Sequence, residues 1–159
     1  MNEDARFEDA RGAPLRLRAM DADDLAVIST LVQDAVFPVT EMTWRPKKRE
    51  FAILLNRFRW EDAPLAQARK RPFERVRSVL LFSDVEKVAT QGVDRTDRDI
   101  VLSLMAVTYQ PAEDGRGRCI LTLAGDGAIG IDIEALDVTL QDVTRPYRAP
   151  SGQMPDHKD

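Results

Sequence analysis

The sequence predicts an α+β domain: a mainly antiparallel, strongly curved sheet or small barrel of about seven to eight strands, with one amphipathic helix. Three observations predict this fold. Short segments of alternating or β-favouring apolar residues recur along the chain, and turn-forming residues separate them. One segment, close to the N-terminus, places apolar residues at helical spacing. Strands joined by hairpins in this number must curl or fold over to bury one face.

Length and composition favour a single domain. A chain of 159 residues, 43% of them apolar, has enough apolar surface for one core. We expect the globular domain to span residues 15–145, between a flexible lead-in (1–14) and a flexible tail (146–159). No apolar run is long enough to span a membrane, and the acidic N-terminus is unlike a secretory signal. The single cysteine cannot form an internal disulfide, which fits a reducing compartment, so we expect a cytoplasmic protein. Because no segment could span a membrane, we expect no membrane partner.

The first predicted elements are a strand and the helix. Residues 15–20 alternate, which indicates a half-buried strand. Asp21 is a suitable N-cap for the helix that follows, because its side-chain oxygen can accept a hydrogen bond from the first turn. Leu25, Ile28 and Ala35 then recur at helical spacing, and Pro38 ends the helix.

The centre of the chain predicts a hairpin. Residues 39–44 and 50–60 form its strands, and residues 45–49 form its turn. The second strand carries apolar side chains on both faces, which indicates that other elements cover it on both sides. Residues 61–72 leave two interpretations open, a helical turn over residues 65–69 or a charged connection broken by prolines.

The C-terminal half predicts further antiparallel strands. Their expected bounds are 75–82, with an extension through 85–88 after a bulge, then 100–109, 118–123 and 128–133. Asp126 and Gly127 supply the positive φ angles that a tight hairpin requires between the last two. Residues 134–143 fit a strand or a helix, and Val138 with Thr139 favours a strand. One helix on such a sheet resembles the pleckstrin-homology architecture in shape, a comparison that implies no function.

The sequence contains no recognisable catalytic or metal-binding motif. A zinc site needs several ligands at close spacing, whereas the only histidine, His157, lies in the tail and Cys119 begins a strand. Cys119 has no nearby base and is interpreted as a small buried filler. Asp132 and Glu134 share a strand face and form a candidate acid–base couple, but alternating charge is typical of a solvated face. We therefore expect no catalytic residue, no metal and no cofactor.

The charge distribution is the compositional feature that suggests a function. Residues 45–77 hold eleven Lys or Arg against four Asp or Glu, a local charge of +7 in a chain whose net charge is −4. Such asymmetry creates a local positive field on an acidic protein.

The candidate binding residues are the cationic and aromatic side chains of this segment: Lys47, Lys48, Arg49, Arg57, Arg59, Trp44 and Trp60. We expect Arg57, Arg59 and the 47–49 turn to form one contiguous positive patch. Guanidinium groups beside aromatic rings hold phosphates while bases stack, as in proteins that bind single-stranded RNA. Arginine also makes forked hydrogen bonds to the carboxylates of an acidic protein. The alternative is that Phe58 and Trp60 belong to the core while the two arginines point into water.

Several segments carry a resemblance to a known family. Residues 51–61, with the run Leu-Asn-Arg-Phe-Arg-Trp-Glu, are the most distinctive, and residues 24–29, 33–35 and 75–78 add to them. Over residues 15–148 the chain resembles an uncharacterised alphaproteobacterial family, domain of unknown function 2948. The resemblance implies a small bacterial cytosolic protein and assigns no activity or site residue.

Together these observations predict a non-enzymatic binding or accessory domain that contacts an anionic partner through the basic, aromatic segment 45–77. Two alternatives stay open. A homodimeric interaction module would bury Trp44, Phe58 or Trp60 between subunits. A small-molecule enzyme would enclose a pocket with converging polar groups.

Overall fold

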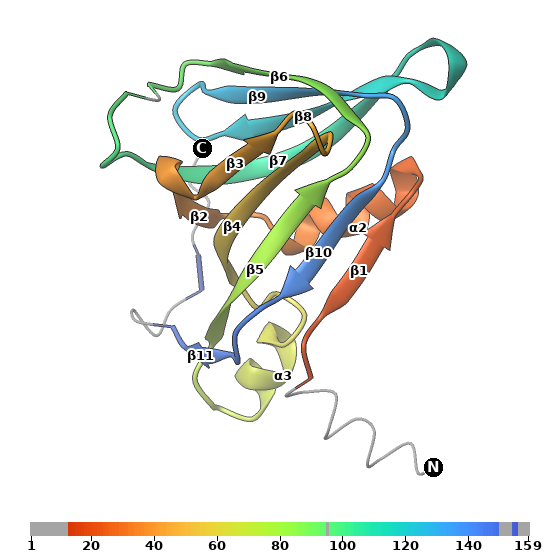
Figure 1. The fold of residues 1–159 in the computed structure, drawn as a ribbon. Helices are drawn as coiled ribbons and strands as arrows, with labels where there is room; N and C mark the ends of the chain where they lie inside the picture. Colours follow the sequence, from red (N-terminus) through yellow and green to blue (C-terminus); the bar gives the residue numbers. More distant parts are fainter. Residues whose placement is uncertain (1–12, 95, 150–153, 156–159) are drawn as a thin grey trace.

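The computed structural model describes residues 13–94, 96–149 and 154–155. Within them, one antiparallel sheet and a few short helices make up the fold, so the predicted α+β class is confirmed (Figure 1). The sheet has eleven strands in the order β1-β10-β5-β4-β2-β7-β8-β9-β6, with β3 paired to β4 and β11 paired to β5. The strands are β1 (Arg16–Ala19), β2 (Ala35–Pro38), β3 (Met42–Arg45), β4 (Glu50–Phe58), β5 (Glu74–Phe82), β6 (Val85–Gln91), β7 (Val101–Pro111), β8 (Gly117–Leu123), β9 (Ala128–Ile133), β10 (Val138–Asp142) and β11 (Tyr147–Arg148).

The sheet is open, so the predicted barrel of about seven to eight strands is wrong. In the described residues, β1 and β6 are the two ends of the strand order, and no ladder joins them. The sheet nevertheless curls strongly. The evidence is that Ala19 from β1 and Val85 from β6 belong to the same hydrophobic core. Strands that are far apart in the order therefore share one interior, and a free edge remains at each end.

Helix α2 (Ala22–Leu31) begins as predicted at Asp21, whose Oδ1 accepts a hydrogen bond from the Asp24 N–H at 2.8 Å. The helix packs against β7 and β1. The prediction that it continues through Ala35 is wrong. Asp34 has a φ of 64°, which ends the helical path, and Ala35 starts β2, which pairs with β7. Ala35 and Phe37 are both buried, so the alternation of a strand overrides the helical spacing.

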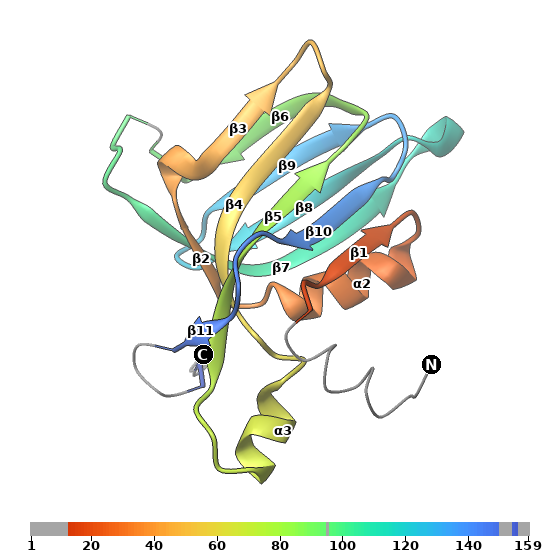
Figure 2. The ribbon, with the colours of Figure 1, turned by 60° about the horizontal axis from the view of Figure 1, so that its bottom comes forward.

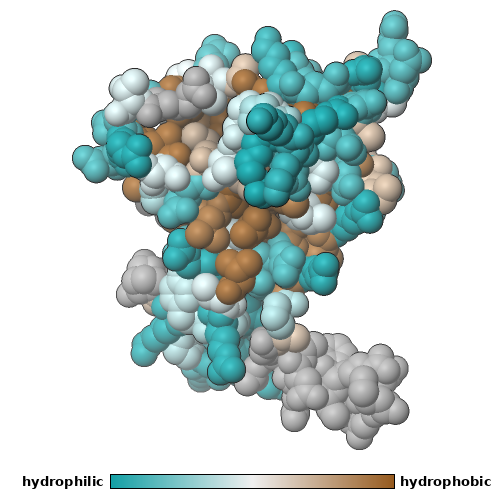
Figure 3. Space-filling view, in the orientation of Figure 1, coloured by the Kyte–Doolittle hydropathy of each residue, from teal (hydrophilic) through white to brown (hydrophobic). Residues whose placement is uncertain are grey.

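The central hairpin is confirmed, with β3 and β4 joined by a turn at 46–49. Its first strand is shorter than predicted, because residues Val39–Glu41 form the 3-10 helix η1. On β4, Phe51, Ile53 and Leu55 face the core. The expected cover on the opposite face is not found among the described residues: Leu54 is half-buried, and Figure 3 shows hydrophobic surface over β4 and β5.

The segment between β4 and β5 contains the helix α3 (Ala63–Ala68), which decides for the helical interpretation of residues 61–72. This helix lies beyond the end of the sheet, away from the β3–β4 turn (Figure 2). The described part of the chain contains no helix with the length and apolar character needed to cross a membrane.

The C-terminal half forms the expected strands, with one ambiguity decided as favoured and two differences. Residues 85–91 form the separate strand β6, which pairs with β9 instead of extending β5. Within the ambiguous segment 134–143, β10 is a strand. In the segment predicted as a tail, Tyr147 and Arg148 pair with β5. Residues 1–12 of the predicted lead-in, and His157, lie outside the described residues.

Candidate functional site

The predicted binding residues lie at opposite ends of β4. Lys47 and Lys48 are in the turn before the strand, whereas Arg57 and Arg59 are at its far end. A nine-residue strand measures about 26 Å from its first to its last Cα. The structure therefore does not bring these side chains into one patch, and the expectation of a contiguous positive surface is wrong.

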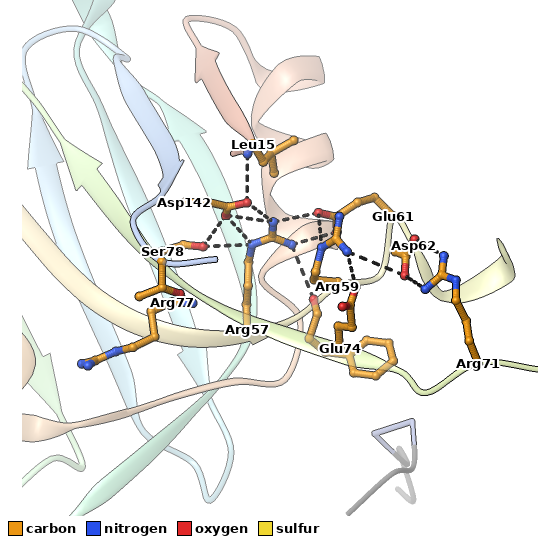
Figure 4. A network of polar contacts seen from close by, with 12 residues as sticks. Leu15, Arg57, Arg59, Glu61, Asp62, Arg71, Glu74, Arg77, Ser78 and Asp142 are labelled. Atoms are coloured by element: carbon orange, nitrogen blue, oxygen red, sulfur yellow. Dashed lines mark hydrogen bonds and ion pairs between the residues drawn. The ribbon is translucent and has the colours of Figure 1, made fainter. Parts of the chain in front are cut away.

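Arg57 is buried inside a polar network at the far end of β4 (Figure 4). Its side chain is 0% exposed. It donates two parallel hydrogen bonds of 2.8 Å to the Glu61 carboxylate, and its Nη2 donates to Asp142 Oδ1 at 3.0 Å. The Ser78 hydroxyl donates to the same Asp142 oxygen at 2.6 Å, and the Leu15 N–H donates to Asp142 Oδ2. We call these five residues the Arg57 network.

Arg59 continues this set of ion pairs towards α3. Its guanidinium pairs with Glu74 at 2.5 Å and lies 3.7 Å from Asp62. Arg71 makes a bidentate contact with the same Asp62, at 2.6 and 2.7 Å. Arg57, Arg59 and Arg71 are thus held by carboxylates. Arg71 closes the segment around α3 on itself, and Arg59 links that segment to Glu74 of β5.

Burial and pairing have opposite effects on the charge of Arg57. Burial alone lowers its pKa, but hydrogen bonds and charge from Glu61, together with Asp142, outweigh burial and raise the pKa above its ordinary value. Arg57 is therefore a permanently charged internal group. The alternative in which Arg57 points into water is also wrong.

The aromatic side chains beside these arginines are part of the fold. The Phe58 ring is fully buried and meets the Trp60 ring edge-on at 4.7 Å. The Trp60 indole N–H donates to the Gln33 carbonyl at 2.9 Å. This donor is consequently not available to a ligand. The alternative that placed both rings in the core is confirmed for Phe58, whereas Trp60 is half-buried.

The opposite end of β4 has exposed cations. Lys47 and Lys48 make no ion pair with any residue in the described ranges. Arg49 pairs with Glu134 at 2.5 Å on the surface, and Arg45 lies 3.5 Å from Glu50. The turn thus keeps two lysine charges facing solvent.

Next to this turn, the two free strand edges of β3 and β6 flank a pocket of about 280 Å³. At the closed end of the gap, the Val85 N–H donates to the Arg49 carbonyl at 2.9 Å. Figure 2 shows β3 and β6 next to each other. The lining residues define what we call the β3–β6 pocket: Val39, Thr40, Met42, Trp44, Phe51, Val88, Thr90 and Arg98.

The β3–β6 pocket combines apolar walls with one cation. The half-buried Trp44 pairs across the hairpin with Phe51, and both side chains face the interior of the curled sheet. Arg98 reaches the pocket from the loop between β6 and β7 and makes no ion pair with a described residue. In that loop, Asp94 and Asp97 accept hydrogen bonds from Thr96 and Asp99. The pocket therefore presents rings, hydroxyl groups and a guanidinium to a ligand.

Sequence reasoning identified Trp44 but missed the other half of this site. Val88 and Thr90 alternate inwards on β6, and Arg98 is 54 positions after Trp44. An available signal was the polar stretch between the strands predicted at 85–88 and 100–109, since loops carry many binding residues.

Two other candidates are structural. Cys119 is buried, which raises the pKa of its thiol to about 12 and makes the thiolate rare at neutral pH. Asp132 pairs with Arg118, and Glu134 pairs with Arg49, so these carboxylates act separately. Among the described residues, no cluster of His, Cys, Asp and Glu is arranged to hold a metal ion.

Comparison with known proteins gives a family and no activity. No curated protein and no solved structure matches the chain. The model of a family described as a protein of unknown function, DUF2948, matches residues 15–157. This range includes both ends of β4 and the β3–β6 pocket. The chain therefore belongs to the DUF2948 family.

Proposed function

We propose that the protein is a cytosolic, non-enzymatic binding domain whose β3–β6 pocket holds the apolar part of an anionic ligand while Arg98 pairs with its negative charge. The observation that carries this proposal is that the aromatic rings of Trp44 and Phe51 line the same pocket as the guanidinium of Arg98. This guanidinium has no ion pair among the described residues. Apolar walls with a few converging polar groups are the usual composition of a ligand site.

The charges around the pocket support an anionic ligand. A guanidinium binds a carboxylate or phosphate through two parallel hydrogen bonds, and it does so better where no internal carboxylate competes. Lys47 and Lys48 add a positive field from the adjacent turn. This site takes the place of the wider basic surface expected over residues 45–77, because Arg57 and Arg59 are committed to internal carboxylates.

The pocket lining favours binding over catalysis. Its polar side chains are two threonine hydroxyls and one guanidinium, Thr40, Thr90 and Arg98. Neither threonine nor arginine is among the side chains that usually serve as general acid or base. A general acid or base of suitable pKa would be needed for most hydrolytic or isomerisation chemistry.

The test uses phenylacetate, which carries one ring and one carboxylate, and its neutral analogue phenylacetamide. Binding is measured by changes in protein NMR spectra and by quenching of tryptophan fluorescence. We expect phenylacetate to bind with a Kd of about 1 mM, typical of a small fragment. Phenylacetamide should bind at least about tenfold more weakly, because the ion pair with Arg98 is lost.

Two variants and a matched control locate the binding. Arg98→Gln should reduce phenylacetate affinity to that of the amide, and Trp44→Leu should weaken both ligands. Arg16→Gln removes an exposed arginine from β1, at the other end of the strand order, and should leave both affinities unchanged. Equal affinities for acid and amide, or full phenylacetate binding by Arg98→Gln, would overturn the proposal.

A further inference from the structure

We infer that the ligand of the β3–β6 pocket is an extended, acidic peptide segment of another protein, which adds as a strand to the open edge of β6. This inference rests on the proposed function, since it names the class of ligand for the same site. The peptide would place an apolar side chain in the pocket and a carboxylate at Arg98. Four features of the described residues carry the inference.

The first feature is the free edge of β6. One side of this strand pairs with β9 from Val85 to Gln91. On the other side, β6 pairs with no strand among the described residues, and at its beginning the Val85 N–H donates a hydrogen bond to the Arg49 carbonyl. From Lys87 onwards the edge therefore offers N–H and C=O groups to an added strand, the arrangement that peptide-binding sheets use.

The second feature is a difference between the two ends of the sheet. The edge strand β1 has four residues, and two of them are the exposed arginines Arg16 and Arg18. Charges at this density discourage edge-to-edge pairing. On β6 the charges Glu86 and Lys87 are confined to the beginning of the strand, whereas the run Val88–Gln91 carries no charge and no proline, and Ala89 is exposed. The edge of β1 is thus protected against an incoming strand, and the second half of β6 lacks this protection.

The third feature is the position and size of the pocket along this edge. Val88 and Thr90 lie opposite the buried Ile131 and Ile129, so their side chains face the interior and line the pocket. Side chains of an added strand would alternate in the same way. A volume of about 280 Å³ lies just below the range of about 300–1,000 Å³ typical of small-molecule ligands. It suits one or two side chains, with the backbone held at the edge.

The fourth feature is that cations without an ion pair among the described residues lie at both ends of the gap. Lys47 and Lys48 lie at the end where β6 begins, and Arg98 lies beyond the end where β6 finishes. Charges placed about one strand length apart fit acidic residues that flank an apolar centre. This complementarity selects an acidic peptide over a neutral or basic one.

The test is selection of octapeptides from a random phage-displayed library on the full-length protein. We expect enrichment of sequences in which one apolar residue is flanked by Asp or Glu. The enriched peptide is then synthesised with and without N-methyl groups on alternate backbone amides. Methylation on the side that faces β6 should weaken binding at least about tenfold, whereas methylation of the other alternate set should have a smaller effect. Alternate amides of Lys87–Gln91 should exchange with solvent more slowly in the complex.

Several outcomes would overturn the inference. These are selection without an acidic consensus, equal affinity of the two methylated series, and protection of amides elsewhere than on β6. Single-stranded RNA that displaces the peptide at physiological salt would assign the cations to nucleic acid instead. Phenylacetate binding separates the two proposals: if it depends on Arg98 while no peptide binds the β6 edge, the pocket function stands and the peptide is excluded. Arg98→Glu should abolish binding of the peptide, and Arg16→Glu, the matched control, should not.

Discussion

The two ends of β4 carry similar residues but use them differently. At one end, Arg57 and Arg59 are 0% and 5% exposed and paired with carboxylates from three other segments. At the other end, Lys47 and Lys48 face solvent beside a pocket that contains Trp44. The difference shows that a basic, aromatic sequence pattern does not specify a surface. Its burial depends on where the acids of distant segments lie.

The largest expected effect is at the buried end. Arg57→Met leaves the Asp142 carboxylate, 6% exposed, without its cation, and should lower the free energy of unfolding by about 3–5 kcal/mol. Urea unfolding followed by circular dichroism measures the loss. Arg57→Met combined with Asp142→Leu should recover most of it, because no buried charge is then left unpaired. A loss below about 1 kcal/mol for Arg57→Met would show that the Arg57 network is not required for stability.

A smaller effect is expected for the ion pair that holds α3. Arg71→Ala removes the bidentate contact with Asp62, which is 5% exposed, and should lower the stability by about 2 kcal/mol. Amides of Ala63–Ala68 should exchange faster in this variant. Arg69→Ala is the matched control, because Arg69 is exposed and has no ion pair among the described residues. Identical behaviour of the two variants would contradict the anchoring by Arg71.

At the exposed end we expect almost no change in stability. The double variant Lys47→Glu/Lys48→Glu should unfold within about 0.5 kcal/mol of the wild type, because neither lysine has an internal partner in the described structure. Its affinity for the selected acidic peptide should nevertheless fall, most strongly at low salt. A stability loss above about 1 kcal/mol would mean that these lysines support the fold.

The smallest effect concerns the surface pair between Arg49 and Glu134. The hydrogen bond from Arg49, and then its charge, lower the pKa of Glu134. A lowered folded-state pKa stabilises the protein above the unfolded value of about 4.3, and this stabilisation is lost as the pH falls through the folded-state pKa. The urea midpoint of the wild type should therefore exceed that of Glu134→Gln at pH 7, and the two should converge once the pH falls below the lowered folded-state pKa of Glu134. A difference that grows on acidification would contradict the assignment.

Local signals in the sequence predicted much of the fold. Asp21 predicted the start of α2, and the β-favouring runs on either side of residues 45–49 predicted the β3–β4 hairpin. The end of α2 could not be predicted in this way, because Ala35 satisfies helical spacing and strand alternation at once. Pairing with β7, a contact between distant segments, decides in favour of the strand.

The candidate site was less predictable for the same reason. Glu61 is four residues from Arg57, but Asp142 is 85 residues away, and no local pattern indicates that they meet. Likewise, the pocket forms because the curled sheet brings the edge of β6 next to β3, with Arg98 in the following loop. The aromatic half of the site was visible as Trp44, and the half contributed by β6 depended on the curvature of the sheet.

The long separation between Arg57 and Asp142 also affects how the chain is made. Ribosomes add about 5–20 residues per second, so the 85 residues between these partners take about 4–17 s to synthesise. During that interval Glu61 is the near carboxylate that emerges with Arg57. A nascent chain that stops before β10 would therefore have Arg57 paired with Glu61 but not with Asp142. The Arg57 network can form completely only after β10 has been synthesised.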